Sequence, residues 1–153
     1  MAQWKELLMD IKKIEEKYGS SLRNPVSDKE IKNLQQLVHE KLGNIQLPES
    51  YIDFLKSVNG LDFNGLVIYG VDQELLGEPN RENLQGFVKT NEIWHENESQ
   101  KQYVFFGDSD IAWFCFDLKQ NIYLELDKPS GTLIKSFNSF ESMLCGALQT
   151  TLL

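Results

Sequence analysis

The chain has 153 residues, of which 41% are hydrophobic and 25% are charged, and its formal net charge is −8. This length and composition are typical of one folded domain over residues 1–153 and exclude a globally disordered chain. The 15 basic residues are outnumbered by 23 acidic ones and are scattered, which argues against direct nucleic-acid binding.

Neither a membrane segment nor a redox or metal motif is evident in the sequence. Every apolar run falls far short of the ~20 residues that a membrane-spanning helix needs, and no secretory signal opens the chain. Cys115 and Cys145 lie far apart in apolar surroundings, without the spacing of a metal or redox pair. We therefore expect a cytoplasmic protein with two buried free thiols, no cofactor, no metal and no membrane contact.

Two amphipathic helices are predicted at the start of the chain. Residues 2–18 carry apolar side chains at helical spacing, and the last of them is Tyr18. A second helix opens at Ser27, because Glu30 follows three residues later and completes a capping box. Gly43 is the expected end of this second helix.

A third helix and the strand behind it form the predicted folding nucleus. Pro48 suits the first helical position, and Asn59-Gly60 is expected to end the helix, because glycine adopts the left-handed conformation readily. Asp62–Gly65 reads as a turn, and residues 66–70 read as a buried strand. The apolar stripe of this helix consists of Tyr51, Phe54, Leu55 and Val58.

The segment after this strand is harder to assign. Residues 70–83 form an acidic loop that is longer than most connections, and loops of this length often carry function. Behind this loop, a helix over residues 81–98 is the favoured assignment. The alternative is a short strand over residues 87–90, with Asn91 capping a brief helix behind it.

The last part of the chain predicts an antiparallel meander and a final helix. Four strands are expected at residues 103–106, 112–118, 122–126 and 132–136, with Gly107–Asp110 as the first turn. Asn138 is the expected cap of the final helix, paired with Glu141, and Phe137 is placed in the core. The resulting fold class is α+β: one antiparallel meander flanked by N-terminal helices and a C-terminal helix.

Little in the sequence resembles a catalytic site. His39 and His95 stand alone on separate predicted helices, and no nucleophile, metal or phosphate-binding motif occurs. Asp108 and Asp110 could bind a divalent cation, but aspartates more often stabilise turns. The aromatic residues are read mainly as core, with Tyr69 and Trp94 beside loops where they could anchor an interface. A protein that is not an enzyme is the expectation.

Several segments together resemble the SMI1/KNR4 (SUKH) superfamily, and in particular its YrhA-like branch. They lie in the order and spacing of that superfamily and cover the chain from about Ile31 to its end. The segments are Leu47–Leu55 with Asn59-Gly60, Phe63–Gly70, Thr90–Trp94, Phe106–Asp110 and Phe137–Glu141.

This resemblance implies an α+β fold and an immunity protein. Such a protein binds and neutralises a cognate secreted toxin, with a nuclease of a contact-dependent or type VII system as the expected class. The negative charge of this chain fits a basic toxin domain as the partner. Two alternatives remain: a non-catalytic regulatory scaffold like the relatives linked to cell-wall synthesis, and a small hydrolase using Asp108 and Asp110 with a metal.

The candidate toxin-binding residues are the carboxylates expected in exposed acidic loops and the two loop-flanking aromatics. They are Asp72, Glu74, Glu78, Asp108, Asp110, Tyr69 and Trp94.

Overall fold

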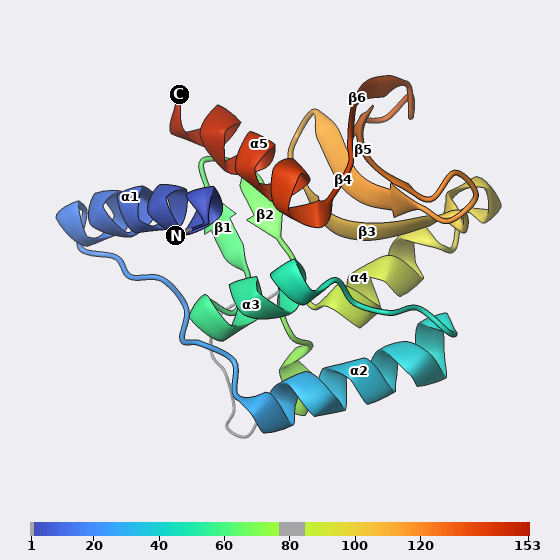
Figure 1. Cartoon of the computed structure of the whole chain (residues 1–153), viewed down its shortest axis with the longest axis horizontal. Coiled ribbons are helices and arrows are strands. Elements are labelled where there is room, and N and C mark those ends of the chain that lie inside the picture. Colours follow the sequence, from blue (N-terminus) through green and yellow to red (C-terminus); the bar gives the residue numbers. More distant parts are fainter. Residues whose placement is uncertain (1, 77–84) are drawn as a thin grey trace.

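The computed structural model describes residues 2–76 and 85–153 (Figure 1). The helices in this part are α1 (Gln3–Lys17), α2 (Asp28–Leu42), α3 (Glu49–Ser57), α4 (Phe87–Trp94) and α5 (Phe140–Leu152), with short 3-10 helices η1 (Gln73–Leu75) and η2 (Glu98–Gln100). The strands are β1 (Leu61–Phe63), β2 (Leu66–Ile68), β3 (Tyr103–Asp108), β4 (Ala112–Asp117), β5 (Ile122–Asp127) and β6 (Leu133–Phe137). The favoured helical assignment of the segment before the meander is confirmed for Phe87–Trp94, while residues 95–98 lie beyond the end of α4 and residues 81–84 of the predicted range lie outside the described residues.

The strands form one antiparallel sheet in which neighbours in sequence are neighbours in space. The order is β1-β2-β3-β4-β5-β6, which confirms the predicted meander and the α+β fold class. Directly paired residues share a face of the sheet, so Asp108, Trp113 and Leu126 lie in one row across β3, β4 and β5. A bulge between Phe105 and Gly107 interrupts the alternation of β3, so that Phe105 and Asp108 share the face of Trp113, and Phe106 lies on the opposite face.

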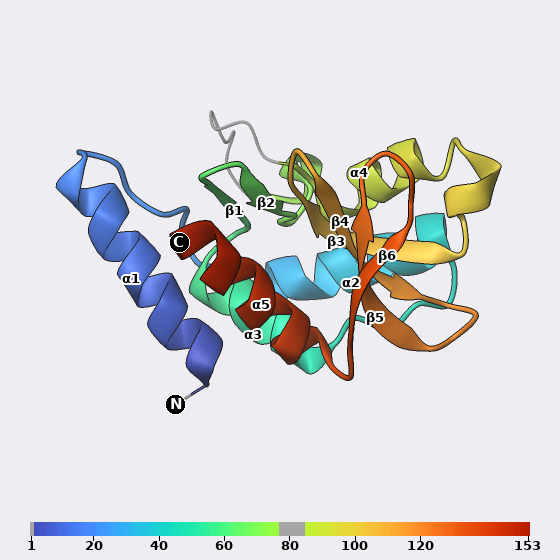
Figure 2. The same ribbon diagram turned by 90° about the horizontal axis from the view of Figure 1, so that it is seen from above.

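That opposite face carries the main aromatic core. The ring of Tyr51 on α3 lies 5.1 Å from the ring of Phe106 on β3 and 5.3 Å from the ring of Phe140 on α5. Helix α1 packs along α5, as both views show (Figures 1 and 2). Helix α4 packs against α2 and against β3. The predicted nucleus around the third helix is therefore at the centre of the fold.

The ends of α3 differ from the sequence prediction. Pro48 precedes the helix as its N-cap, with an extended ψ of 142°, instead of occupying the first helical position. The helix ends at Ser57, and Val58 is extended, so Gly60 does not close it. The left-handed φ of 77° at Gly60 serves a close approach instead, because a Cβ there would lie 2.9 Å from the carbonyl oxygen of Ile68.

A strand was missed where a turn was predicted. Leu61 and Phe63 are buried on β1, and only Asn64 and Gly65 make the turn to β2, both with positive φ. This is the backbone of a two-residue hairpin turn, for which an Asn-Gly pair is the strongest sequence signal. The expected four-residue turn therefore contains two of the three residues of β1, Asp62 and Phe63.

Two other boundaries shift for local reasons. Gly107 and Asp108 belong to β3 and not to a turn, because Gly107 pairs with Phe114 and Asp108 pairs with Trp113 on β4. Ser139, and not Asn138, caps α5, since its Oγ accepts the N–H of Ser142 at 3.1 Å. The capping box of α2 is confirmed as predicted.

The predicted core is largely confirmed in the described residues. Cys115 and Cys145 are buried free thiols, and Phe137 is 7% exposed. The prediction that Tyr18 belongs to the apolar face of the first helix is wrong, because Tyr18 follows the last residue of α1 and is 77% exposed. None of the described helices has the length and apolarity needed to cross a lipid bilayer.

Candidate functional site

Three of the residues predicted for binding meet in one group of side chains joined by hydrogen bonds and ring contacts, which we call the Tyr69 cluster (Tyr69, Trp94, Asp108, Trp113 and Lys128). Trp94 Nε1 donates to Tyr69 Oη at 3.0 Å, and Tyr69 Oη donates to Asp108 Oδ2. Lys128 Nζ lies 3.4 Å from Asp108 Oδ1, and 5.3 Å and 5.8 Å from the ring centres of Trp94 and Trp113. The cluster thus joins β2, α4 and the meander.

The electrostatics of this cluster favour a structural role. Tyr69 is fully buried, and this burial raises the pKa of its phenol, with the negative charge of Asp108 adding to the increase. The phenol therefore stays protonated and keeps donating to the carboxylate. Asp108 is mostly buried, with 17% of its side chain exposed, and each of its oxygens already has a partner. We infer that Tyr69 and Asp108 hold the fold together beneath the surface instead of meeting a partner directly.

The prediction that Asp72 lies exposed in an acidic loop is wrong, because its side chain is buried. It is 3% exposed, and it accepts the N–H of Val88 at 3.0 Å and of Lys89 at 2.9 Å. These are free donors in the first turn of α4, which has no side-chain cap of its own. Gly86 is required beside the carboxylate, since a Cβ there would lie 2.5 Å from Asp72 Oδ2. Asp72 therefore caps α4 from a distant segment.

Removing this remote cap is expected to destabilise the fold. Asp72→Ala leaves two backbone N–H groups without an acceptor. We therefore expect a loss of about 2 kcal/mol in the free energy of unfolding at neutral pH, measured by urea denaturation. The matched control is Glu74→Ala, an exposed carboxylate nearby, for which we expect a change within about 0.5 kcal/mol.

The pH dependence of this effect follows from the direction of the pKa shift. Burial raises the pKa of Asp72 above its ordinary value of 3.8, against the opposing effect of its backbone hydrogen bonds. The folded protein then holds this proton more tightly than the unfolded chain, so the contribution of Asp72 falls as pH rises above about 4. The stability difference between wild type and Asp72→Ala should be larger at pH 4 than at pH 7. A difference that instead grows toward pH 7 would contradict this interpretation.

The remaining predicted residues divide by exposure. Glu74 on η1 and Asp110 in the β3–β4 turn are exposed, as a binding surface requires. Asp110 lies next to the β1–β2 hairpin, because its Oδ2 is 4.0 Å from the position of a Cβ on Gly65. Trp94 is partly buried in the Tyr69 cluster, and Glu78 lies outside the described residues. Their roles in binding stay predictions.

Three residues of structural importance were not selected from the sequence. Lys128 and Trp113 complete the Tyr69 cluster, and Asn91 is fully buried between α4 and β3. Lys128 follows directly after β5 in a turn, where a lysine normally reads as a solvated residue. Of these three residues, only Asn91 could have been recognised from the sequence. It lies inside an apolar helix, and a buried amide there needs several hydrogen bonds.

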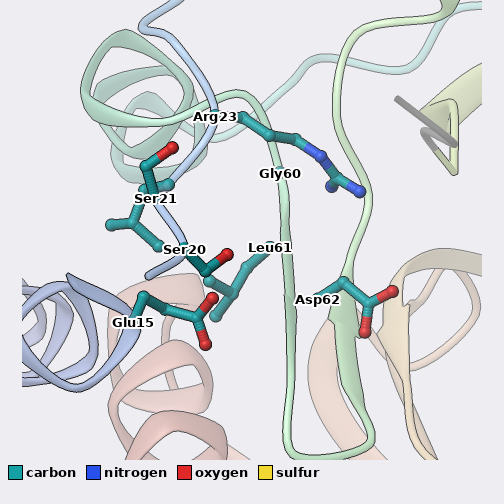
Figure 3. A pocket seen from close by; sticks show the side chains of 8 residues that line it. Glu15, Ser20, Ser21, Arg23, Gly60, Leu61 and Asp62 are labelled. Atoms are coloured by element: carbon teal, nitrogen blue, oxygen red, sulfur yellow. The ribbon is translucent and has the colours of Figure 1, made fainter. Parts of the chain in front are cut away.

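Within residues 2–76 and 85–153, no three His, Cys, Asp or Glu side chains gather where they could hold a metal ion. A cavity of about 200 Å³ opens between the end of α1 and the start of β1 (Figure 3). Glu15 and Ser20 lie on one side of it in this view, and Arg23 and Asp62 on the other. Carboxylates, hydroxyls and a guanidinium line it, and the described part of the chain contributes no histidine or cysteine to it.

The comparison with protein families gives a specific result. The model of the SMI1 / KNR4 family (SUKH-1) matches residues 25–146, which is well over half of the chain and spans α2 to the first half of α5. Helix α1 lies outside this match. The search of curated proteins finds no match to the chain. The matched region contains every strand of the sheet, and the chain belongs to the SMI1/KNR4 (SUKH-1) family.

Proposed function

We propose that this protein is an immunity protein that acts in the cytoplasm, where it binds a cognate secreted toxin domain and blocks it without catalysis. The observation that carries this proposal is membership of the SMI1/KNR4 family, which is known for immunity-type proteins. The proposed mechanism is occupation of the toxin surface by direct protein–protein contact.

The charge of the chain supports a basic partner, with a nuclease as the expected kind. The net charge is −8, and a nuclease must carry positive charge to hold phosphate groups. Complementary charge accelerates association and restricts the choice of partner. Since Asp72 and Asp108 are engaged inside the fold, the proposal assigns charge recognition to the exposed Glu74 and Asp110.

Charge reversal at these two positions tests the proposed surface. The double variant Glu74→Lys/Asp110→Lys should bind the C-terminal domain of the proposed cognate toxin on the order of tenfold more weakly, mainly through slower association. Its ability to restore growth to cells expressing that toxin should fall in parallel. Both substitutions are at exposed positions, so unfolding midpoints should change little.

A second double variant controls for net charge. Glu16→Lys/Glu6→Lys on α1 makes the same change in net charge at exposed positions outside the family match. It should bind within about threefold of wild type. Equal weakening by both double variants would contradict a local acidic site and indicate a nonspecific charge effect. Absence of toxin binding by the wild type would contradict the immunity function and favour the regulatory scaffold.

A further inference from the structure

The two edges of the sheet differ in whether a further strand could pair with them. Strand β1 forms one edge and β6 forms the other. At the β1 edge, Leu61 and Phe63 are buried, and the hydroxyl of Thr151 on α5 donates to the carbonyl oxygen of Phe63 at 3.0 Å. Asn64 Nδ2, in the β1–β2 turn, donates to the carbonyl oxygen of Thr151 at 3.1 Å. The end of α5 therefore occupies the β1 edge.

The β6 edge is exposed along most of its length (Figure 1). Residues 133–136 are exposed, and since successive residues of a strand point to opposite faces, neither face of this part is covered. Leu133 is 57% exposed and Ile134 is 50% exposed, and in the described part of the chain they are the exposed large apolar side chains that lie on a strand. An edge strand also directs backbone N–H and C=O groups away from its neighbour. Strand β6 thus combines backbone hydrogen-bonding groups with exposed apolar side chains.

The pairing of β6 with β5 shows how this edge selects against a second copy of the chain. Lys135 is the middle residue of β6 and pairs with Glu125, while Leu133 pairs with Leu126, so Ile134 is the extra residue of a bulge. A lysine and a bulge both hinder pairing of an edge with an unsuitable strand. Antiparallel self-pairing centred on β6 would place two copies of Lys135 directly opposite each other, which is unfavourable. The formal net charge of −8 on each copy adds to this repulsion.

We propose that β6 receives an extended segment of the toxin as an additional antiparallel strand, with a carboxylate of that segment opposite Lys135. This inference rests on the proposed function and names the surface that binds the toxin and the chemistry of the bound segment. A carboxylate opposite Lys135 stabilises the strand pair, where a second Lys135 would repel. An apolar side chain opposite Leu133 would cover the exposed leucine. Main-chain hydrogen bonds supply the affinity of such a pairing, and the side chains supply its specificity.

A carboxylate in the bound segment is compatible with a basic toxin domain. The net charges of the two proteins steer their encounter over distances of about a Debye length, whereas Lys135 and its partner interact as adjacent side chains. The two contributions can be separated, because Lys135→Glu makes the chain more acidic and yet should weaken binding.

Substitution of Lys135 tests the charge pairing with the proposed cognate toxin domain, sought among the proteins encoded beside the gene. Lys135→Glu should bind this domain about fivefold more weakly, because an attractive cross-strand pair becomes a repulsive one. Lys135→Arg keeps the charge and should bind within about twofold of wild type. Lys135 is exposed, so unfolding midpoints should change little.

The matched control is Lys32→Glu on α2. It makes the same change in net charge at an exposed position on the other side of the molecule from β6 (Figure 1). It should bind the toxin domain within about twofold of wild type. Equal affinities of Lys32→Glu and Lys135→Glu would overturn the proposal.

Nuclear Overhauser effects in the complex test the strand addition itself. With the full chain isotope-labelled and the toxin domain unlabelled, amide protons of residues 133–136 should show effects to backbone protons of the toxin domain, and amide protons of β1 should show none. A complex without these effects at β6 would overturn the strand addition and leave the immunity function standing. Such effects between two copies of β6 in a toxin-free dimer would also overturn the proposal and identify a second copy as the occupant. No toxin binding by the wild type would overturn both the inference and the function on which it rests.

Discussion

Tyr51→Ala is expected to lower the free energy of unfolding by about 4 kcal/mol, as for other large aromatic residues removed from a core. The side chain is fully buried, and its ring lies within 5.5 Å of the rings of Phe87, Phe106 and Phe140. It therefore connects three helices to the sheet, and its removal leaves a cavity that these elements cannot close independently. Urea denaturation at neutral pH measures the change.

Tyr51→Phe separates packing from hydrogen bonding at this position. The hydroxyl of Tyr51 donates to the carbonyl oxygen of Tyr69 at 2.6 Å, and the phenylalanine variant keeps the ring while leaving that carbonyl unpaired. We expect a loss of about 1.5 kcal/mol. A phenylalanine variant as unstable as the alanine variant would show that the hydrogen bond, and not the aromatic packing, dominates at the centre of the fold.

Asn91→Ala is expected to cost about 3 kcal/mol, because it removes three hydrogen bonds that are shielded from water. Asn91 Nδ2 donates to the carbonyl oxygens of Phe87 at 2.8 Å and Phe105 at 2.9 Å, and Oδ1 accepts the N–H of Phe105 at 2.7 Å. Strand β2 pairs with β3 only near Gly107 and Asp108. Asn91 therefore provides the hydrogen bonds that a neighbouring strand would give to Phe105.

Asn91→Ala should change hydrogen exchange near Phe105 as well as the stability of the whole fold. Besides the loss of stability, exchange of the Phe105 amide hydrogen should accelerate relative to amides in the centre of β4. Asn91→Asp keeps the acceptor but loses both donors, so its stability should lie below that of wild type as well. Glu92→Ala, at the exposed neighbouring position, is the control and should change stability by no more than about 0.5 kcal/mol. An Asn91→Ala variant within about 1 kcal/mol of wild type would contradict this role.

The sequence predicted the elements of this fold better than their ends. Periodicity located the helices and the meander because apolar spacing records which face is buried. Pro48, Gly60 and Asn138 were misassigned by one or a few residues, since several neighbouring residues can cap or end a helix and tertiary contacts decide among them. Strand β1 was missed because three residues are too few to show an alternating pattern.

The candidate site was predicted less well because exposure depends on the tertiary fold. Asp72 reads as a loop carboxylate, yet the free N–H groups of α4 lie beside it and it is buried as their cap. Tyr69 and Trp94 were selected as neighbours of loops, and their hydrogen bond could not be inferred from residues that are 25 positions apart. Lys128 illustrates the same limit, because its partner Asp108 is on β3, 20 positions earlier in the chain.

Calorimetric titration of this chain with the proposed cognate toxin domain, sought among the proteins encoded beside its gene, tests the central claim most directly. The proposed function predicts a one-to-one complex with a nanomolar dissociation constant. This constant should weaken at least tenfold as ionic strength rises from about 0.05 M to about 0.5 M, because exposed charges are screened. The absence of binding at micromolar concentrations of both proteins would contradict the account of this protein as an immunity protein.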